Sequence, residues 1–249
     1  MRLLLHQLRN EQRLFWRSRE LAFFTFALPI VFFVLLGSVY GGDRIEGVRG
    51  SSYLLAGLLG YGLSATTFAG LAIVTVIRRE DGILKRLRGT PLPAWAYLGA
   101  VLASTLLVYA LQTACLILLG HLLFDTPIPQ RWLSLALALL VGGLAFAALG
   151  LALTAAVRSA EGSSAVVNAV YLPMAFISGS FFSPHSFPGF LEAIAEVLPL
   201  TYFIDLVRDI VLAHRPIWQS WEPVAVIAAW GAVGLLAALR WFRWQPRQG

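Results

Sequence analysis

The sequence predicts an all-α integral membrane protein with six transmembrane helices. An N-terminal interfacial helix, a cytoplasmic helix between the second and third spans, and a re-entrant helix pair before the last span complete the predicted fold. Two observations predict this class. The 249 residues are 58% hydrophobic and 13% charged, whereas soluble domains are about 45–50% apolar and about 25% charged. Uncharged runs long enough to cross a bilayer also recur along the chain, so residues 1–249 are expected to form a single transmembrane domain.

Each uncharged run of roughly 17–25 residues is a candidate span, because a helix of that length crosses the hydrocarbon core. Six such runs occur: Leu21–Tyr40, Tyr53–Ile77, Trp95–Leu119, Trp132–Val157, Ser164–Phe182 and Val224–Leu239. The positions of Lys and Arg set their orientation. With the N-terminus inside, 14 of the 19 Lys and Arg residues lie on the cytoplasmic side, including Arg240, Arg243 and Arg247. A multi-pass protein with both termini cytoplasmic is therefore predicted.

The segment 1–19 is predicted to be an amphipathic helix on the inner leaflet. Its basic residues repeat at helical spacing, while Leu4, Leu5, Leu8 and Phe15 face elsewhere, which is typical of an interfacial helix. The alternative is a simple positive anchor that sets the topology.

The segment 78–93, RREDGILKRLRGTPLP, is predicted to contain a helix of about ten residues that docks a partner. Ile83, Leu84 and Leu87 form a narrow apolar stripe among charged residues. Gly89, Pro91 and Pro93 are stop signals for a helix. A basic loop that only sets topology is the alternative, but such a loop needs neither an apolar stripe nor a marked end.

The segment 184–215 is predicted to be a re-entrant helix pair on the outer side. One apolar piece follows Pro188 and a second covers Thr201–Ala213, with Pro199 between them. Pieces of 10–14 residues are too short to cross a bilayer. A hairpin that lies on the surface without a function is the alternative.

Sequence motifs for catalysis and for metal or nucleotide binding do not occur. There is no G-x-x-x-x-G-K-[ST] loop, no H-E-x-x-H and no G-x-S-x-G, and the four histidines lie far apart. No catalytic residue, metal site or bound cofactor is therefore expected. Cys115 is the single cysteine, which excludes an internal disulfide. The pI near 10.0 comes from charges beside the spans, so no nucleic-acid partner is expected.

The span interiors carry no Asp, Glu, Lys or Arg, which disfavours an ion-driven carrier. An integral-membrane enzyme acting on lipid is a further alternative, although it would need a cluster of reactive groups at one depth. Asn168 in the fifth span is costly in hydrocarbon unless it has a partner or a wet cavity. Small residues in the second and fourth spans suit close helix packing.

Two stretches resemble the type-2 (ABC-2 type) ABC transporter permeases. The first follows the pattern RE-x-G-T-L-K-R-L-R-x-T-P-L-P, with Ile83 in place of the common Thr; the matching residues are Arg79, Glu80, Gly82, Leu84, Lys85, Arg86, Leu87, Arg88, Thr90, Pro91, Leu92 and Pro93. The second comprises Pro199, Leu200, Thr201, Tyr202, Asp205 and Arg208, preceded by Ser178, Gly179, Phe181 and Phe182. Leu198 stands where many members have Asn. The similarity covers nearly the whole chain and is nearest to the bacterial drug-efflux branch.

The resemblance implies the permease subunit of an ATP-driven exporter in the bacterial inner membrane. Two cytoplasmic ABC ATPase subunits would bind ATP and Mg²⁺, and a second permease copy, expected to be a homodimer partner, would complete the assembly. Amphipathic drug-like or lipid-like substrates are expected, with polysaccharide or lipid export on the same scaffold as the alternative.

Three sets of site residues follow from the resemblance. Coupling to the ATPase is expected at Arg79, Glu80, Lys85, Arg86 and Leu87. The substrate pathway, on the two-fold axis, is expected at Tyr61, Ser64, Thr67, Phe68, Asn168, Tyr171 and Met174, which would otherwise only pack helices. An external gate is expected at Pro199, Thr201, Asp205 and Arg208.

Overall fold

The computed structural model describes residues 2–90 and 92–242. The predicted stop residue Pro91 and the C-terminal Arg243 and Arg247 lie outside the described residues. The helices are α1 (Arg2–Arg17), α2 (Arg19–Tyr40), α3 (Gly50–Leu63), α4 (Leu71–Glu80), α5 (Ile83–Arg88), α6 (Ala94–Phe124), α7 (Trp132–Leu153), α8 (Ala160–Ile177), α9 (Gly189–Ala195), α10 (Pro199–Val211) and α11 (Trp221–Trp241). A π-helix, η1 (Ser64–Gly70), joins α3 to α4, and the short 3₁₀ turns η2 (Pro184–Ser186) and η3 (Ile217–Gln219) flank the α9–α10 region.

A two-stranded hairpin follows α2. Strands β1 (Arg44–Ile45) and β2 (Val48–Arg49) pair antiparallel, with Arg44 opposite Arg49. The two residues between the strands, Glu46 and Gly47, both have positive φ, 50° and 81°. Positive φ at both central residues is the geometry of the tight turn that suits the twist of a hairpin.

Within the described residues, five helical stretches are long and apolar enough to cross a membrane: Arg19–Tyr40, Gly50–Glu80, Trp95–Phe124, Trp132–Leu153 and Trp221–Trp241. Five of the six predicted spans coincide with them, although the third extends beyond Leu119 and the fourth stops before Val157. The predicted fifth span corresponds to α8, which has 18 residues. Glu161, Asn168 and Pro173 lower its apolar character, and a sixth span there stays a prediction.

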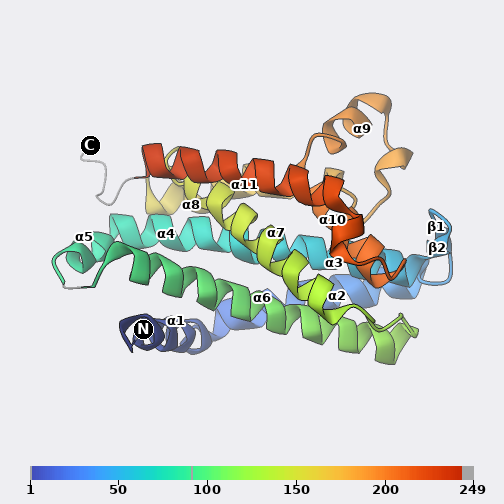
Figure 1. Cartoon of the computed structure of the whole chain (residues 1–249), viewed down its shortest axis with the longest axis horizontal. Coiled ribbons are helices and arrows are strands. Elements are labelled where there is room, and N and C mark those ends of the chain that lie inside the picture. Colours follow the sequence, from blue (N-terminus) through green and yellow to red (C-terminus); the bar gives the residue numbers. More distant parts are fainter. Residues whose placement is uncertain (1, 91, 243–249) are drawn as a thin grey trace.

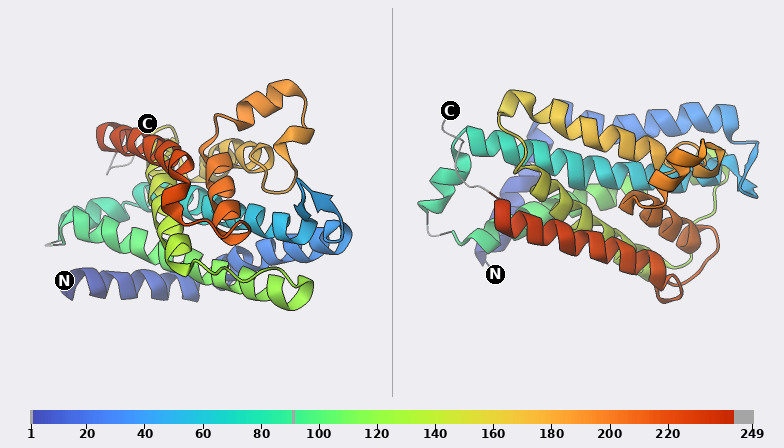
Figure 2. Two further views of the ribbon diagram at one scale, coloured as in Figure 1. Left: turned by 45° about the vertical axis from the view of Figure 1, so that its right-hand side comes forward. Right: turned by 90° about the horizontal axis from the view of Figure 1, so that it is seen from above.

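The spans lie side by side along the long axis of the molecule (Figure 1). One end, called here the α5 end, carries α5 and the start of α1; the other, the α10 end, carries the hairpin, α9 and α10. Helix α1 lies obliquely across the spans near the α5 end (Figure 2). The continuous stretch α3–η1–α4 occupies the centre, and every residue of α3 from Gly50 to Leu63 is buried.

Small residues make the central position of α3 possible. A Cβ atom on Gly57 would collide with the backbone carbonyl of Ser180, and one on Gly60 would overlap the side chain of Ile204 in α10. Helices pack closely in lipid where small residues let their backbones approach. The predicted packing role of these glycines therefore places α3 against both α10 and the segment after α8.

Candidate functional site

Helix α5 projects from the α5 end and presents a basic face. It has six residues, fewer than the predicted ten, because α4 continues to Glu80 and the chain then turns at Gly82, whose φ is +70°. Leu84 is fully buried in a cluster with Leu71 and Tyr97, which anchors the helix to the bundle. Lys85 and Arg86 are exposed. These two predicted coupling residues therefore lie where a partner could reach them.

The other predicted coupling residues are turned toward the chain itself. The side chain of Leu87 is half-buried against the cluster that holds Leu84. Arg79 is only 2% exposed, and its Nε donates to Glu80 Oε1 over 2.8 Å. Arg79 also donates to the backbone carbonyls of Thr154 (2.9 Å) and Val157 (2.7 Å). The charge of Arg79 was expected to contact a partner protein. In the structure Arg79 instead supplies hydrogen-bond donors to carbonyl groups that follow the last turn of α7 and have no donor within that helix.

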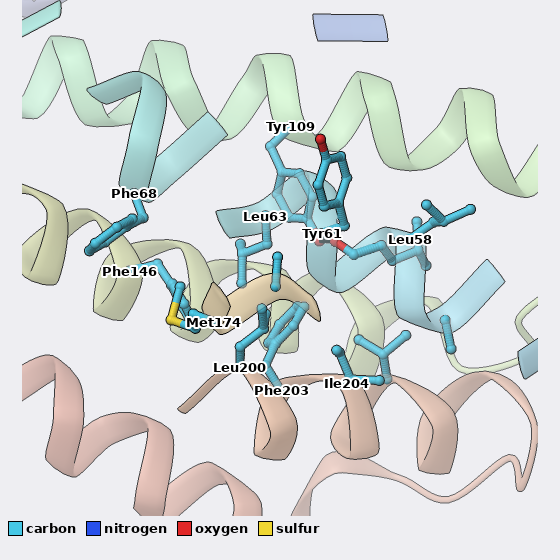
Figure 3. Close-up of a cluster of buried hydrophobic side chains, with 14 of the residues drawn as sticks. Leu58, Tyr61, Leu63, Phe68, Tyr109, Phe146, Met174, Leu200, Phe203 and Ile204 are labelled. Atoms are coloured by element: carbon cyan, nitrogen blue, oxygen red, sulfur yellow. Dashed lines mark hydrogen bonds between the residues drawn. The ribbon is translucent and has the colours of Figure 1, made fainter. Parts of the chain in front are cut away.

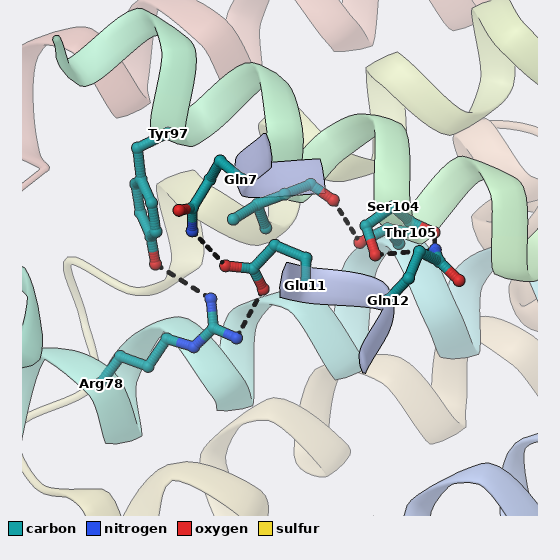
Figure 4. Close-up of polar contacts among 8 residues, drawn as sticks. Gln7, Glu11, Gln12, Arg78, Tyr97, Ser104 and Thr105 are labelled. Carbon is teal, nitrogen blue, oxygen red and sulfur yellow. Dashed lines mark hydrogen bonds and ion pairs between the residues drawn. The ribbon is translucent and has the colours of Figure 1, made fainter. Parts of the chain in front are cut away.

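A second polar cluster attaches α1 to the spans (Figure 4). Arg78 donates to Glu11 Oε2 over 2.7 Å and to the Tyr97 hydroxyl over 3.0 Å. Gln7 donates to the other Glu11 oxygen over 2.9 Å, and the Glu11 side chain is 6% exposed. Gln12 donates to Ser104 Oγ and to its backbone carbonyl. The N-terminal helix is therefore bound to α4 and α6 by its polar residues.

Glu11, Gln7 and Gln12 are not among the residues expected from the sequence to form a site. A signal was nevertheless present, since Glu11 is an acid on a basic helix and Gln7 stands four residues before it, one turn away on the same face.

The second span contains a π-helical segment with three hydroxyl side chains. In a π-helix, hydrogen bonds that span five residues replace the usual bonds that span four. Some backbone carbonyl groups then need another hydrogen-bond donor. Ser64 donates to the Tyr61 carbonyl over 3.0 Å, and Thr66 and Thr67 donate over 2.7 Å to those of Gly62 and Leu63. The hydroxyls thus satisfy the backbone of this segment, as Ser and Thr do in interrupted transmembrane helices.

A cavity of about 380 Å³ lies between α1, α2, the end of α3, η1, α4, α6 and α8. Glu11 and Arg78 line its end toward α5, while Tyr61, Asn168 and Tyr171 line its inner end. Its middle is lined mainly by apolar residues of α2, η1, α4 and α6, which include Phe24, Leu28, Ala65, Ala69, Ile73 and Val108. Three of the seven predicted pathway residues, Tyr61, Asn168 and Tyr171, are thereby brought together.

The other four predicted pathway residues lie away from this cavity. Ser64 and Thr67 are fully buried and bond to their own helix. Phe68 and Met174 lie among the buried side chains of the core, as does Phe146 (Figure 3). The sequence placed all seven on two spans but could not decide which face each occupies, because both faces of the central helix are buried.

Aromatic rings close the inner end of the cavity toward the α10 end. The ring centroid of Tyr61 lies 5.7 Å from that of Tyr171, 6.0 Å from that of Phe32 and 5.3 Å from that of Phe181. Phe181 also lies 5.0 Å from Phe176. Edge-to-face and tilted pairs at such spacings are favourable. Phe32 and Phe176 were not singled out in the sequence, because single aromatic residues in apolar spans carry no distinguishing pattern.

The predicted gate residues lie at the α10 end. Pro199 begins α10, and Thr201 Oγ1 donates to the Ala195 carbonyl over 2.6 Å, which joins α10 to α9. Arg208 donates to Asp205 and to the Gly179 carbonyl, both over 3.0 Å.

Two further contacts lie at the α10 end. The Arg208 guanidinium lies 3.8 Å from the ring centroid of Tyr53, so this side chain links α10, α3 and the segment after α8. On the loop before α9, the hydrogen bond with Glu192 raises the pKa of His185.

Comparison with known proteins identifies the family. The family described as ABC-2 type transporter matches residues 3–212. The transport permease YvfS of Bacillus subtilis (strain 168) is 24% identical over 82% of this chain and 83% of its own length. Nodulation protein J of Rhizobium leguminosarum bv. trifolii is 30% identical over 80% of this chain and 78% of its own.

A third relative, the daunorubicin resistance ABC transporter permease protein DrrB1 of Streptomyces coeruleorubidus, is 25% identical over 87% of this chain and 77% of its own length. The apolar spans and the family match together describe a multi-pass membrane protein of the permease type. The chain belongs to the ABC-2 type transporter family.

Proposed function

We propose that the chain is the membrane-spanning permease subunit of an ATP-driven exporter of amphipathic drug-like or lipid-like compounds. ATP and Mg²⁺ are bound and used by a separate cytoplasmic ABC ATPase subunit, and the chain itself catalyses no reaction. Two ATPase subunits and a second copy of this chain complete the transporter. The α5 end faces the cytoplasm of a bacterial cell and the α10 end faces outward.

The observation that carries this proposal is the connection between α5 and the spans. Lys85 and Arg86 are exposed on a short helix that Leu84 anchors to the bundle. One turn before it, Arg79 is hydrogen-bonded to the end of α7. A displacement of α5 by a partner would therefore move α4 and α7 together, because packed helices shift as units. Such a connection is what a permease driven by an external ATPase requires.

The cavity supports an apolar rather than a saccharide substrate. Its middle is mainly apolar, and the three threonine hydroxyls that line it, those of Thr25, Thr66 and Thr105, already donate to backbone carbonyls. A sugar polymer would need many hydrogen-bonding groups that this wall does not offer. Polysaccharide or lipid export is the alternative within the same family, since the similar proteins include both a daunorubicin resistance permease and Nodulation protein J.

The test is ATP-dependent uptake of a fluorescent apolar dye into inside-out membrane vesicles that contain the chain and its ABC ATPase subunit. Uptake is expected with ATP and absent with a non-hydrolysable ATP analogue or when the ATPase is present without the chain. If a soluble neutral oligosaccharide suppresses the uptake of the dye, the result would favour saccharide export, the alternative function. Equal uptake with and without the chain would refute the exporter function.

A further inference from the structure

The cavity carries no net charge at its end toward α5. Glu11 and Arg78 are the charged residues that line it there, and they pair with each other over 2.7 Å. Gln7 donates to the other Glu11 oxygen, and Arg78 also donates to the Tyr97 hydroxyl. An ion that enters this end would lose its hydration water, would contact an apolar wall and would find no counter-charge. Burial of an unpaired charge in this way costs free energy. The cavity therefore selects against charged compounds.

The inner end of the cavity has a polar group without a partner. Among the described residues, the Tyr171 hydroxyl makes no hydrogen bond of normal geometry, although Tyr171 is only 5% exposed and the Tyr61 side chain lies beside it. Asn168 lines the cavity one turn before it on α8. A buried polar group left unpaired costs about 1–3 kcal/mol, so this end gains from a bound molecule that supplies a hydrogen-bonding group.

The apolar walls lie between these two ends. A simple acyl chain would bring an apolar terminus to the Tyr171 hydroxyl and leave it unpaired, whereas an aromatic compound with a carbonyl or ether group would satisfy it. Aromatic rings would also extend the tilted ring contact of Tyr61 with Tyr171, whose centroids lie 5.7 Å apart. The volume of about 380 Å³ falls within the roughly 300–1,000 Å³ of pockets that hold drug-sized ligands.

We propose that each chain contains its own binding site for an uncharged aromatic amphiphile in this cavity, with α1 as one wall. The compound lies among Phe24, Leu28 and Val108 and places a hydrogen-bond acceptor at the Tyr171 hydroxyl. Helix α1 contributes Leu14 and Phe15 to the lining, so the N-terminal helix takes part in ligand binding as well as in attachment to the spans. The proposal rests on the proposed function in that it names the compound class transported, but binding itself needs no ATPase.

The test uses the purified chain in lipid nanodiscs without any ATPase. The probe is 4-methoxybenzophenone, an uncharged aromatic ketone that forms covalent bonds with nearby C–H groups under near-ultraviolet light, and the labelled sites are mapped by peptide mass spectrometry. Labelling is expected on Phe24, Leu28 and Val108. Ala69→Phe, which fills the cavity, should reduce it to background, whereas Ala110→Phe, the same change at an exposed position of α6, should leave it unchanged.

A second pair of variants tests the polar end. Tyr171→Phe keeps the ring but removes the hydroxyl, and loss of a hydrogen bond of about 1 kcal/mol should weaken labelling at a subsaturating probe concentration about fivefold. Tyr40→Phe, at an exposed tyrosine, is the matched control.

Labelling that is spread evenly over the spans, or that Ala69→Phe does not reduce, would overturn the proposed binding site. The ATP-dependent uptake in vesicles would remain a separate test of the exporter function. Cavity labelling without any ATP-dependent uptake would instead support the binding site and refute the exporter.

Discussion

The guanidinium of Arg79 donates a hydrogen bond to the backbone carbonyl of Thr154 over 2.9 Å, across 75 residues of sequence. Arg79 is the second-last residue of α4, and Thr154 is the residue that follows α7. A charged side chain that is 2% exposed is retained only when its hydrogen bonds are satisfied. This contact makes Arg79 an internal link between two spans at the end where α5 projects.

Replacing Arg79 by Met should destabilise the protein strongly. The change leaves the Thr154 and Val157 carbonyls without their donor, and breaking a buried charged pair by removing one partner costs about 3–5 kcal/mol. In a chain of this size the thermal unfolding midpoint, followed by circular dichroism in detergent, should fall on the order of 10 °C. Arg86→Met, at an exposed arginine of α5, is the control. Equal midpoints for both variants would show that the buried contacts of Arg79 are dispensable.

The attachment of α1 should depend on Glu11. Glu11→Leu leaves the half-buried Arg78 without its acidic partner and should speed tryptic cleavage between α1 and α2 by about tenfold or more, as expected for a loss of at least 1.4 kcal/mol. Glu20→Leu, at an exposed acid in the first turn of α2, should not.

The double variant Glu11→Leu with Arg78→Leu sharpens this test. Replacing a whole buried ion pair by apolar residues is often neutral, so α1 should be protected again. Cleavage of the double variant as fast as that of Glu11→Leu alone would mean that the pair does not hold α1.

The π-helical segment should require Gly150 on α7. A Cβ atom there would lie 2.6 Å from the Phe68 carbonyl oxygen and 3.1 Å from its Cα. Both are backbone atoms, so the segment cannot yield by a side-chain rotation. Gly150→Ala should cost about 1–3 kcal/mol through overpacking, measured as a lower unfolding midpoint. Gly189→Ala, where no atom lies within 4 Å, should be neutral or stabilising. A neutral Gly150→Ala would contradict the close packing of η1 on α7.

At the α10 end, Arg208 should contribute more to the stability of the fold than Asp205 does. Arg208 binds the Gly179 carbonyl and the face of Tyr53 in addition to Asp205, while the Asp205 side chain is 51% exposed and takes part in an ion pair with Arg208. Asp205→Leu removes a partly exposed ion pair, worth about 0–1 kcal/mol. Arg208→Leu should lower the unfolding midpoint several times more.

Reversing both charges separates the ion pair from the other contacts of Arg208. Because an aspartate or glutamate at position 208 cannot donate to Gly179, the double reversal should stay as unstable as the Arg208 reversal alone. Full recovery in the double reversal would show instead that the ion pair is the main role of Arg208.

Much of the fold could be predicted from the sequence because lipid imposes a simple rule. Uncharged runs of sufficient length mark spans, and five of them were located to within a few residues. The helices α9 and α10 were also expected from the positions of Pro188 and Pro199. The length of α5 was not predicted correctly, because Asp81 and Gly82 form a turn within a stretch whose residue pattern indicates one continuous helix.

The site was harder to predict because the direction of a side chain depends on what packs around its helix. The central stretch from Tyr61 to Phe68 is buried or half-buried all round, so the periodicity of its apolar residues does not show which way each side chain points. Arg79 was taken for a partner contact because the free carbonyls at the end of α7 are invisible in a linear sequence. The ion pair of Glu11 with Arg78 joins residues 67 positions apart. Glu11 stands out as an acid on a basic helix, but a single sequence does not show that Arg78 is its partner.

The most direct test of the central claim is a photo-crosslink from α5 to the ATPase. The amino acid p-benzoylphenylalanine is placed in living cells either at the exposed position of Lys85 or at Phe190 on α9, which is 68% exposed, and the chain is produced together with its ABC ATPase subunit. After irradiation, the account predicts a covalent product between chain and ATPase from position 85 and none from position 190. A product from position 190, or none from position 85 while the two proteins still co-purify, would contradict it.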